Sequence, residues 1–124
     1  MLEFEIDGVK YKAGRIPAMT QFHLLRRLSP VIAILFSNRD PETGIFDPAK
    51  SAAALAEAIA KMSDEDTEYV FGSCLSVVQR EREGGTGYVS IWNASAKAPQ
   101  FDDINIITMI KIVSEIVQGQ IGPF

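Results

Sequence analysis

The sequence predicts a mainly α domain with a small β component, in which four to five helices surround a central helix over Ser63 to Arg82. Three observations lead to this expectation. The Ser63 to Arg82 stretch is apolar around most of its circumference, which is typical of a helix with neighbours on several sides. Elsewhere, apolar residues recur at spacings of three and four, as they do on helices. Only the first thirteen residues and a short stretch from Tyr88 read as strands.

The length of 124 residues fits one domain over 1–124 with one core. Within it we expect a β-hairpin over 2–13, a helical core over 17–83, short strands over 88–101 and a last helix over 102–119. A chain that is 47% hydrophobic and 23% charged is typical of a globular protein.

The net charge of -4 argues against a nucleic-acid partner, because such binding needs a clustered cationic surface. No run of about twenty apolar residues is present, so we expect no membrane span. The acidic N-terminus lacks a signal-peptide pattern, and the single cysteine cannot form an internal disulfide. Together these features predict a cytoplasmic protein without a membrane or nucleic-acid partner.

The first element is a predicted hairpin. Leu2, Phe4 and Ile6 alternate with glutamates, and Asp7-Gly8 suits a type I′ turn, in which both residues have positive φ. The return strand carries two lysines that can face the glutamates. An isolated hairpin is marginal in water, so this one must pack on the helices or pair with another strand.

Two helices should follow the hairpin. Pro17 suits the first turn of a helix that continues to Leu35, with a kink or break near Leu28 to Ser29 because Pro30 cannot donate a backbone hydrogen bond. The acidic, proline-containing stretch Asn38 to Pro48 predicts a loop. Its Ile45 and Phe46 either tack the loop down or are exposed for a partner. An alanine-rich helix is expected over Pro48 to Met62.

The predicted central helix comes next. Ser63 is a good N-cap, and the three acidic residues after it suit the positive end of the helix dipole. Arg80 and Arg82 suit the negative end, and Gly84 with Gly85 should stop the helix. Beyond it, Tyr88 to Asn93 reads as a short strand and Phe101 as part of a second one. These two strands could join the hairpin in one small sheet.

The last helix should begin at Asp102 or Asp103, either of which can cap it. It is rich in isoleucine, so packing must hold it. Its apolar face is wider than a single contact needs, which predicts a partner-binding surface and self-association as a dimer or larger ring. The predicted partner-binding residues are Ile106, Met109, Ile110, Val113, Ile116 and Val117.

The sequence supplies no catalytic, cofactor-binding or metal-binding constellation. His23 has no second ligand at a metal-binding spacing and is interpreted as a half-exposed helix residue. Cys74 lies among apolar residues, unlike reactive cysteines, and is interpreted as core. The acidic residues from Asp64 to Glu68 suit a first helical turn, and the glycines near Gly84 do not follow a strand and open a helix, as a phosphate loop would. By elimination, the chain is interpreted as a binding or assembly protein.

Three stretches in this order resemble the tail assembly chaperones of long-tailed bacteriophages and prophages: QFHLLRRLSPVIA (21–33), DEDTEYVFGSCLSVVQR (64–80) and FDDINIITMIKIVSEIVQ (101–118). The resemblance implies a non-enzymatic protein of the infected host's cytoplasm, absent from the mature virion. It implies binding to the tape measure protein, which is kept soluble until tail tube subunits polymerise around it, with the tail tube protein as a further candidate partner. The longer acidic loop at 38–52 departs from the family pattern.

Two alternatives stay open at this point. The chain could be a structural virion component, such as a tail completion or head–tail joining protein, whose hairpin adds to the sheet of a ring partner. It could also be a small enzyme or regulator whose Tyr, Asp or Arg side chains meet only in the fold. A deep pocket with several strongly shifted titratable groups would favour an enzyme.

Overall fold

The computed structural model describes residues 2–37 and 48–121, and within them the side chains of 2–29, 53 and 55–120. The predicted loop with Ile45 and Phe46 therefore lies outside the described residues, as do the side chains of the apolar run at 31–36. The described helices are α1 (Ala18–Ser37), α2 (Pro48–Ala60), α3 (Asp64–Leu75) and α4 (Ile106–Ile116), which continues into the π-helical turn η2 (Val117–Ile121).

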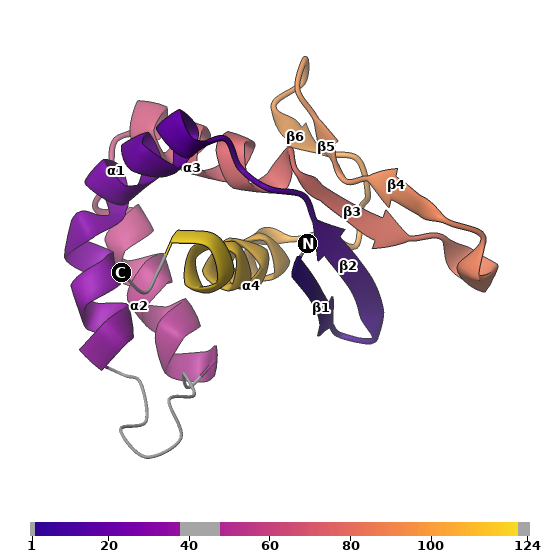
Figure 1. The fold of residues 1–124 in the computed structure, drawn as a ribbon, viewed down its shortest axis with the longest axis horizontal. Helices are drawn as coiled ribbons and strands as arrows, with labels where there is room; N and C mark the ends of the chain where they lie inside the picture. Colours follow the sequence, from indigo (N-terminus) through magenta and orange to yellow (C-terminus); the bar gives the residue numbers. More distant parts are fainter. Residues whose placement is uncertain (1, 38–47, 122–124) are drawn as a thin grey trace.

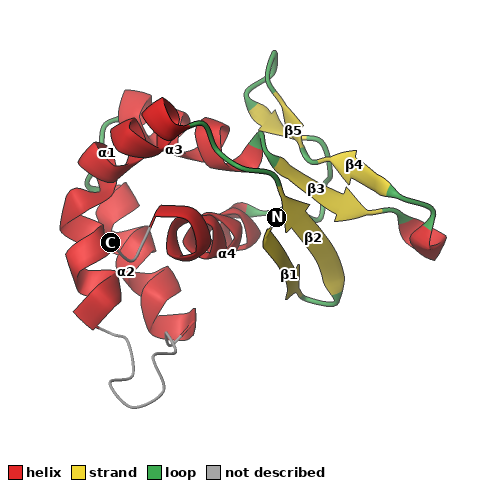
Figure 2. Cartoon of the chain, viewed as in Figure 1, coloured by secondary structure: helices red, strands yellow, loops and turns green. Residues whose placement is uncertain are grey.

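A four-stranded antiparallel sheet, in the order β1-β2-β3-β4, lies to one side of the helices (Figures 1 and 2). A two-stranded ribbon, β5-β6, follows it along the chain. The strands are β1 (Leu2–Ile6), β2 (Val9–Ala13), β3 (Val78–Glu81), β4 (Tyr88–Ser90), β5 (Trp92–Asn93) and β6 (Ala98–Pro99), with a short 3₁₀ turn at Glu83–Gly85. The fold is therefore α+β, and the prediction of a mainly α domain was wrong.

The helix in the middle of the molecule is α4. Figure 1 shows it between α1 and α2 on one side and the sheet on the other, and it contacts α2, α3 and β1. Ile112, Val113 and Ile116 are fully buried. The prediction of a central helix over Ser63 to Arg82 was wrong because α4, whose apolar face is wider, takes that position.

The predicted central helix has the expected beginning and a different end. Ser63 caps α3, and its hydroxyl accepts a hydrogen bond of 3.1 Å from the N–H of Asp66. The helix then ends at Leu75 instead of near Arg82, and residues 78–81 form β3. The physical reason is the open edge of β2, whose backbone groups form hydrogen bonds with β3. The other edge of β3 pairs with β4.

The predicted hairpin is confirmed. Asp7 and Gly8 have φ values of 51° and 82°, as a type I′ turn requires. The register pairs Glu3 with Lys12 and Glu5 with Lys10. The sequence predicted that the hairpin packs on the helices or pairs with another strand, and it does both, because β2 pairs with β3 and β1 contacts α4.

Proline does not break α1. The helix runs without interruption from Ala18 to Ser37, although Figure 1 shows it changing direction along its length. Pro30 cannot donate to the carbonyl of Arg26, and the hydroxyl of Ser29 donates to that oxygen instead, at 3.2 Å. A neighbouring side chain therefore satisfies the acceptor that the proline leaves without its usual donor.

The start of α4 also differs from the prediction. Asn105 caps the helix, accepting hydrogen bonds from the N–H and the hydroxyl of Thr108 at 3.0 and 3.1 Å. Asp103 instead forms an ion pair with Arg80 of β3, in which Oδ1 of Asp103 lies 2.7 Å from Nη1 of Arg80. Phe101 is not in a strand; its ring lies 4.4 Å from the Arg80 guanidinium carbon. These contacts tie the segment before α4 to the sheet.

One cluster of buried side chains joins the helices to the sheet. Its fully buried members come from every layer of the described fold, which is why the elements depend on one another for stability. The largest are Ile16, Leu24, Leu28, Leu55, Leu75, Ile91, Ile112, Ile116, Val70 and Val78.

Replacing Asp103 with asparagine should weaken the fold at neutral pH. The hydrogen bond from Arg80 lowers the pKa of Asp103, so the stability it contributes is present above the unfolded-state pKa and is lost as the pH falls through the folded-state pKa. We expect a loss of about 1 kcal/mol at pH 7, the upper end for a surface ion pair, shrinking toward zero in acid.

Urea unfolding at pH 7 and at successively lower pH values measures this difference. The control is Asp102→Asn, which removes a neighbouring charge that is not part of the Arg80 ion pair. Equal losses for the two variants at every pH would contradict the specific role of Asp103.

Candidate functional site

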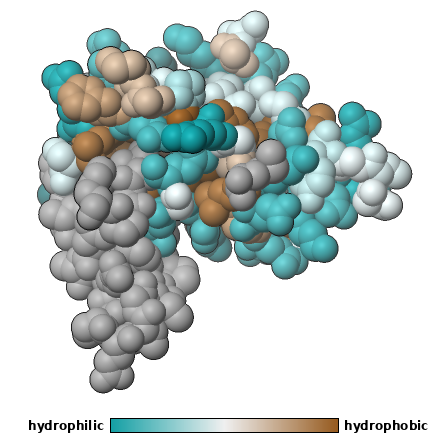
Figure 3. All heavy atoms as spheres, viewed as in Figure 1, coloured by the Kyte–Doolittle hydropathy of each residue, from teal (hydrophilic) through white to brown (hydrophobic). Residues whose placement is uncertain are grey.

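Four large apolar side chains are exposed in the described part of the chain. Met19 (66% exposed) and Phe22 (51%) lie in the first half of α1, and Ile106 (64%) and Ile107 (61%) lie in the first turn of α4. In Figure 3, moderately hydrophobic side chains reach the surface over the start of α1, surrounded by hydrophilic ones. Exposed apolar groups at two helix starts raise the question of what lies between them.

A groove lies between α1, α3 and the β5-β6 ribbon, with a volume of about 480 Å³. We call it the aromatic groove. Its walls include the rings of Tyr69 and Trp92 together with charged side chains at the rim. The residues that define it here are Arg27, Glu65, Glu68, Tyr69, Gly72, Trp92 and Lys97.

Local sequence explains how each aromatic wall is held. Tyr69 lies on α3, and the Arg27 guanidinium stacks on its ring at 4.0 Å while donating a 2.9 Å hydrogen bond to Asp66. Trp92 is in β5 and lies against α3 at Gly72, where an added Cβ would be 3.9 Å from Trp92 Cζ2. Gly72 therefore lies in the groove lining beside Trp92, where a side chain longer than a methyl group would enter the groove.

A second, smaller hollow of about 160 Å³ adjoins the aromatic groove and shares Glu68, Trp92 and Lys97 with it. This hollow reaches Met109 of α4, one helical turn beyond Ile106. Lys97 Nζ lies 3.8 Å from Glu68 Oε2. Both side chains are largely exposed, so this ion pair contributes at most about 1 kcal/mol.

The aromatic surface also extends toward the start of α1. The Phe22 and His23 rings meet edge to face with centroids 5.9 Å apart, and His23 meets Tyr69 in the same way at 6.4 Å. Exposed Phe22 is thereby connected through His23 to the aromatic groove, and the groove is connected to α4 through Met109. We call the whole surface from Phe22 to Met109 the aromatic strip.

The structure separates the six predicted partner-binding residues into two groups. Ile106 is exposed, Met109 lines the smaller hollow and Ile110 is half-buried, whereas Val113, Ile116 and Val117 are buried in the core. Partner binding by α4 stays a prediction, and of these six residues only Ile106, Met109 and Ile110 reach the surface. Sequence reasoning missed Tyr69 and Trp92 as site residues. An aromatic pair at 69 and 92 gives no sequence signal, because the fold alone brings them together.

The side chains that could take part in catalysis or metal binding are buried or paired with other side chains in the described fold. Burial raises the pKa of the Cys74 thiol to about 12, so at neutral pH it is not a thiolate nucleophile. His23 is half-buried between Phe22 and Tyr69. Asp66 pairs with Arg27, and Glu68 with Lys97. Among the residues that the structure describes, no three His, Cys, Asp or Glu side chains are grouped to hold a metal ion.

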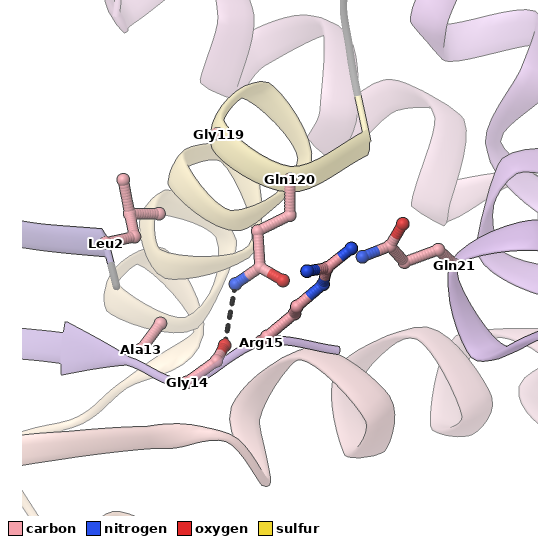
Figure 4. Close-up of a pocket in the computed structure, with 7 residues that line it drawn as sticks. All are labelled: Leu2, Ala13, Gly14, Arg15, Gln21, Gly119 and Gln120. Carbon is pink, nitrogen blue, oxygen red and sulfur yellow. Dashed lines mark hydrogen bonds between the residues drawn. The ribbon is translucent and has the colours of Figure 1, made fainter. Parts of the chain in front are cut away.

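A third cavity of about 380 Å³ lies where the C-terminal turn meets the hairpin (Figure 4). The side chain of Gln120 bridges the connection to α1: its Nε2 donates to the carbonyl of Gly14, and its Oε1 accepts from the N–H of Ile16, both at 2.8 Å. Gln21 donates to the Ile16 carbonyl at 2.9 Å. This polar cavity is therefore a junction that joins distant parts of the chain, and the aromatic strip is the better candidate for partner binding.

Of the helices in the described residues, none combines the length and apolar character needed to cross a membrane. An α+β fold with an aromatic groove and exposed apolar helix starts has the kind of surface that protein-binding proteins offer. The chain matches the family model described as "Phage tail assembly chaperone protein, TAC" over residues 7–124. It therefore belongs to the phage tail assembly chaperone family. No curated protein and no solved structure matches the chain.

Replacing Gln120 with glutamate should destabilise the protein. The carboxylate can still accept from Ile16, but it cannot donate to the Gly14 carbonyl and places two oxygens against each other. We expect a loss of about 1–2 kcal/mol in the free energy of unfolding, measured by urea denaturation at pH 7. Gln79→Glu, the same change on the exposed side of β3, should cost much less; equal costs would contradict the bridging role.

Proposed function

We propose that this protein binds the tape measure protein of its phage and keeps it soluble until tail tube subunits assemble around it. The observation that carries the proposal is the family match, which covers residues 7–124. Membership in a tail assembly chaperone family supports a client among the other tail proteins. The tape measure protein is the client we propose, with the tail tube protein as a further candidate partner.

The exposed apolar groups support this proposal. A long helical client with apolar faces would aggregate unless its faces were covered, and a chaperone needs apolar surface to cover them. Phe22, Ile106 and Ile107 are more than half exposed, and the aromatic groove with its adjoining hollow is lined by residues of α1, α3, the β5-β6 ribbon and α4. Binding of this kind needs no catalysis and no cofactor, and we propose a non-enzymatic role.

The proposed place of action is the host cytoplasm, before the tail is complete. In this scheme the tape measure protein enters the tail and the chaperone is left behind, so the mature virion lacks it. Without a client, the same apolar surface would favour self-association, which fits a dimer or a larger ring.

Co-expression tests the proposed function. The full chain is expressed with the tape measure protein of the same phage, and the soluble fraction of the latter is measured after centrifugation. We expect the soluble fraction to rise several-fold and the two proteins to purify together through a tag on this chain. The tail tube protein, expressed in the same way, serves as a second bait.

Unchanged solubility of the tape measure protein, with no complex recovered, would contradict the chaperone role. Mass spectrometry of purified virions distinguishes the alternative of a structural component. Stoichiometric amounts of this chain in virions would favour that alternative, and its absence agrees with a chaperone released during assembly.

A further inference from the structure

We propose that the aromatic groove and its adjoining hollow receive an amphipathic α-helix of the client, with a basic side chain of that helix beside Glu65. This inference rests on the proposed function and adds the docking surface and the chemistry of the docked segment.

The shape fits side chains presented by a helix. Two hollows of about 480 and 160 Å³ lie side by side and share Trp92 as a common wall. An amphipathic helix presents large apolar groups on one face at spacings of three and four residues, so successive groups can enter successive hollows. Met109 lines the smaller hollow, and exposed Ile106 lies one helical turn before it on α4. Apolar surface therefore continues from the hollow along α4.

An extended peptide is a poorer fit to this surface. Adding a strand requires a row of free backbone groups on the edge of a sheet. Beside the groove, β5 and β6 have two residues each and pair with each other. The side chain of Gln100 already donates to the carbonyls of Ser90 and Trp92, at 3.0 and 3.4 Å. The contacts available to a client are therefore made by side chains.

The charged side chains at the rim of the groove favour a particular charge on the polar side of the client helix. Arg27 is occupied by Asp66 and the Tyr69 ring, and Lys97 lies near Glu68. Glu65 is exposed in the first turn of α3 and is in neither ion pair. Among the charged residues that line the groove, Glu65 is therefore the carboxylate that neither of these two ion pairs neutralises, on a chain with a net charge of -4. A lysine or arginine flanking the apolar face of the client complements this rim.

The Lys97–Glu68 ion pair separates the two hollows without closing them permanently. Its 3.8 Å separation and its exposure make it easy to displace. When a client side chain moves Lys97 aside, the two hollows join into one groove. The ribbon turn that carries Lys97 is held by Asn93, whose side chain accepts from the N–H groups of Ser95 and Ala96 at 3.0 and 3.1 Å.

Trp92 gives a direct test because it is the single tryptophan of the chain. Overlapping synthetic peptides of about 20 residues, covering the tape measure protein, are titrated into the full-length chain while Trp92 emission is followed. We expect emission to shift only with peptides that are amphipathic and basic. Circular dichroism should show that these peptides become helical when bound.

A substitution at Gly72 blocks the groove at its floor. Gly72→Leu places a branched side chain in the groove beside Trp92, and we expect it to weaken binding of those peptides at least ten-fold. Gly72→Ala is the matched control, because its Cβ meets Trp92 at an ordinary contact distance of 3.9 Å. Both changes replace glycine in a helix with a better helix former, so both variants should fold, as checked by urea unfolding.

A charge reversal tests the rim separately. Glu65→Lys should weaken binding of the basic peptides about two- to five-fold at low salt and less at high salt, as expected for a surface ion pair. Glu83→Lys makes the same change in charge at an exposed position in the turn between β3 and β4, away from the groove, and should leave binding nearly unchanged.

Three results would overturn the inference: peptide binding without a change in Trp92 emission, undiminished binding by Gly72→Leu, or a concentration-dependent dimer in ultracentrifugation that Gly72→Leu abolishes and that the peptides do not dissociate. The last result would mean that a second copy occupies the groove. If Gly72→Leu still solubilises the tape measure protein, the docking surface is wrong and the proposed function stands. If the wild type binds peptides at the groove but never raises solubility, the chaperone role fails and the groove stands.

Discussion

The burial of α4 is the constraint on which the rest of the fold depends. Its first half and its core-facing positions are rich in isoleucine and valine, which have weaker helix propensity than leucine or alanine, so the helix is stabilised mainly by what covers it. The cover comes from α2, α3 and the hairpin strand β1. Each of these elements in turn buries its own apolar face against α4. Removing any one of them would expose the same central helix.

This arrangement explains which parts of the fold the sequence could predict. The hairpin, the Ser63 cap and the alanine-rich helix depend on neighbouring residues, and local signals identify them. The strand β3 depends on the open edge of β2. The paired residues Ala13 and Val78 are sixty-five residues apart in the sequence. Residues 76–82 have both helical and strand character, and pairing with β2 and β4 decides between them. No local pattern contains that information.

The candidate site was harder to predict than the fold for the same physical reason. The wide apolar face of the last helix was identified from periodicity, but periodicity cannot distinguish a face buried by the same chain from one left for a partner. Val113 and Ile116 are buried, and Ile106 is exposed. Tyr69 and Trp92 come from different elements, and the fold brings both to the lining of one groove. Only the three-dimensional structure defines that pair.

The core and the aromatic strip differ in how strongly their contacts are held. Core residues such as Leu24, Leu75 and Ile112 are fully buried, and moving them would cost several kcal/mol each. The strip is bounded by exposed side chains and by the Lys97–Glu68 ion pair, whose rupture costs at most about 1 kcal/mol. A client can therefore rearrange the rim without disturbing α4. A chaperone that must later release its client benefits from such a surface, because weak rim contacts limit affinity while the rigid core keeps the groove in place.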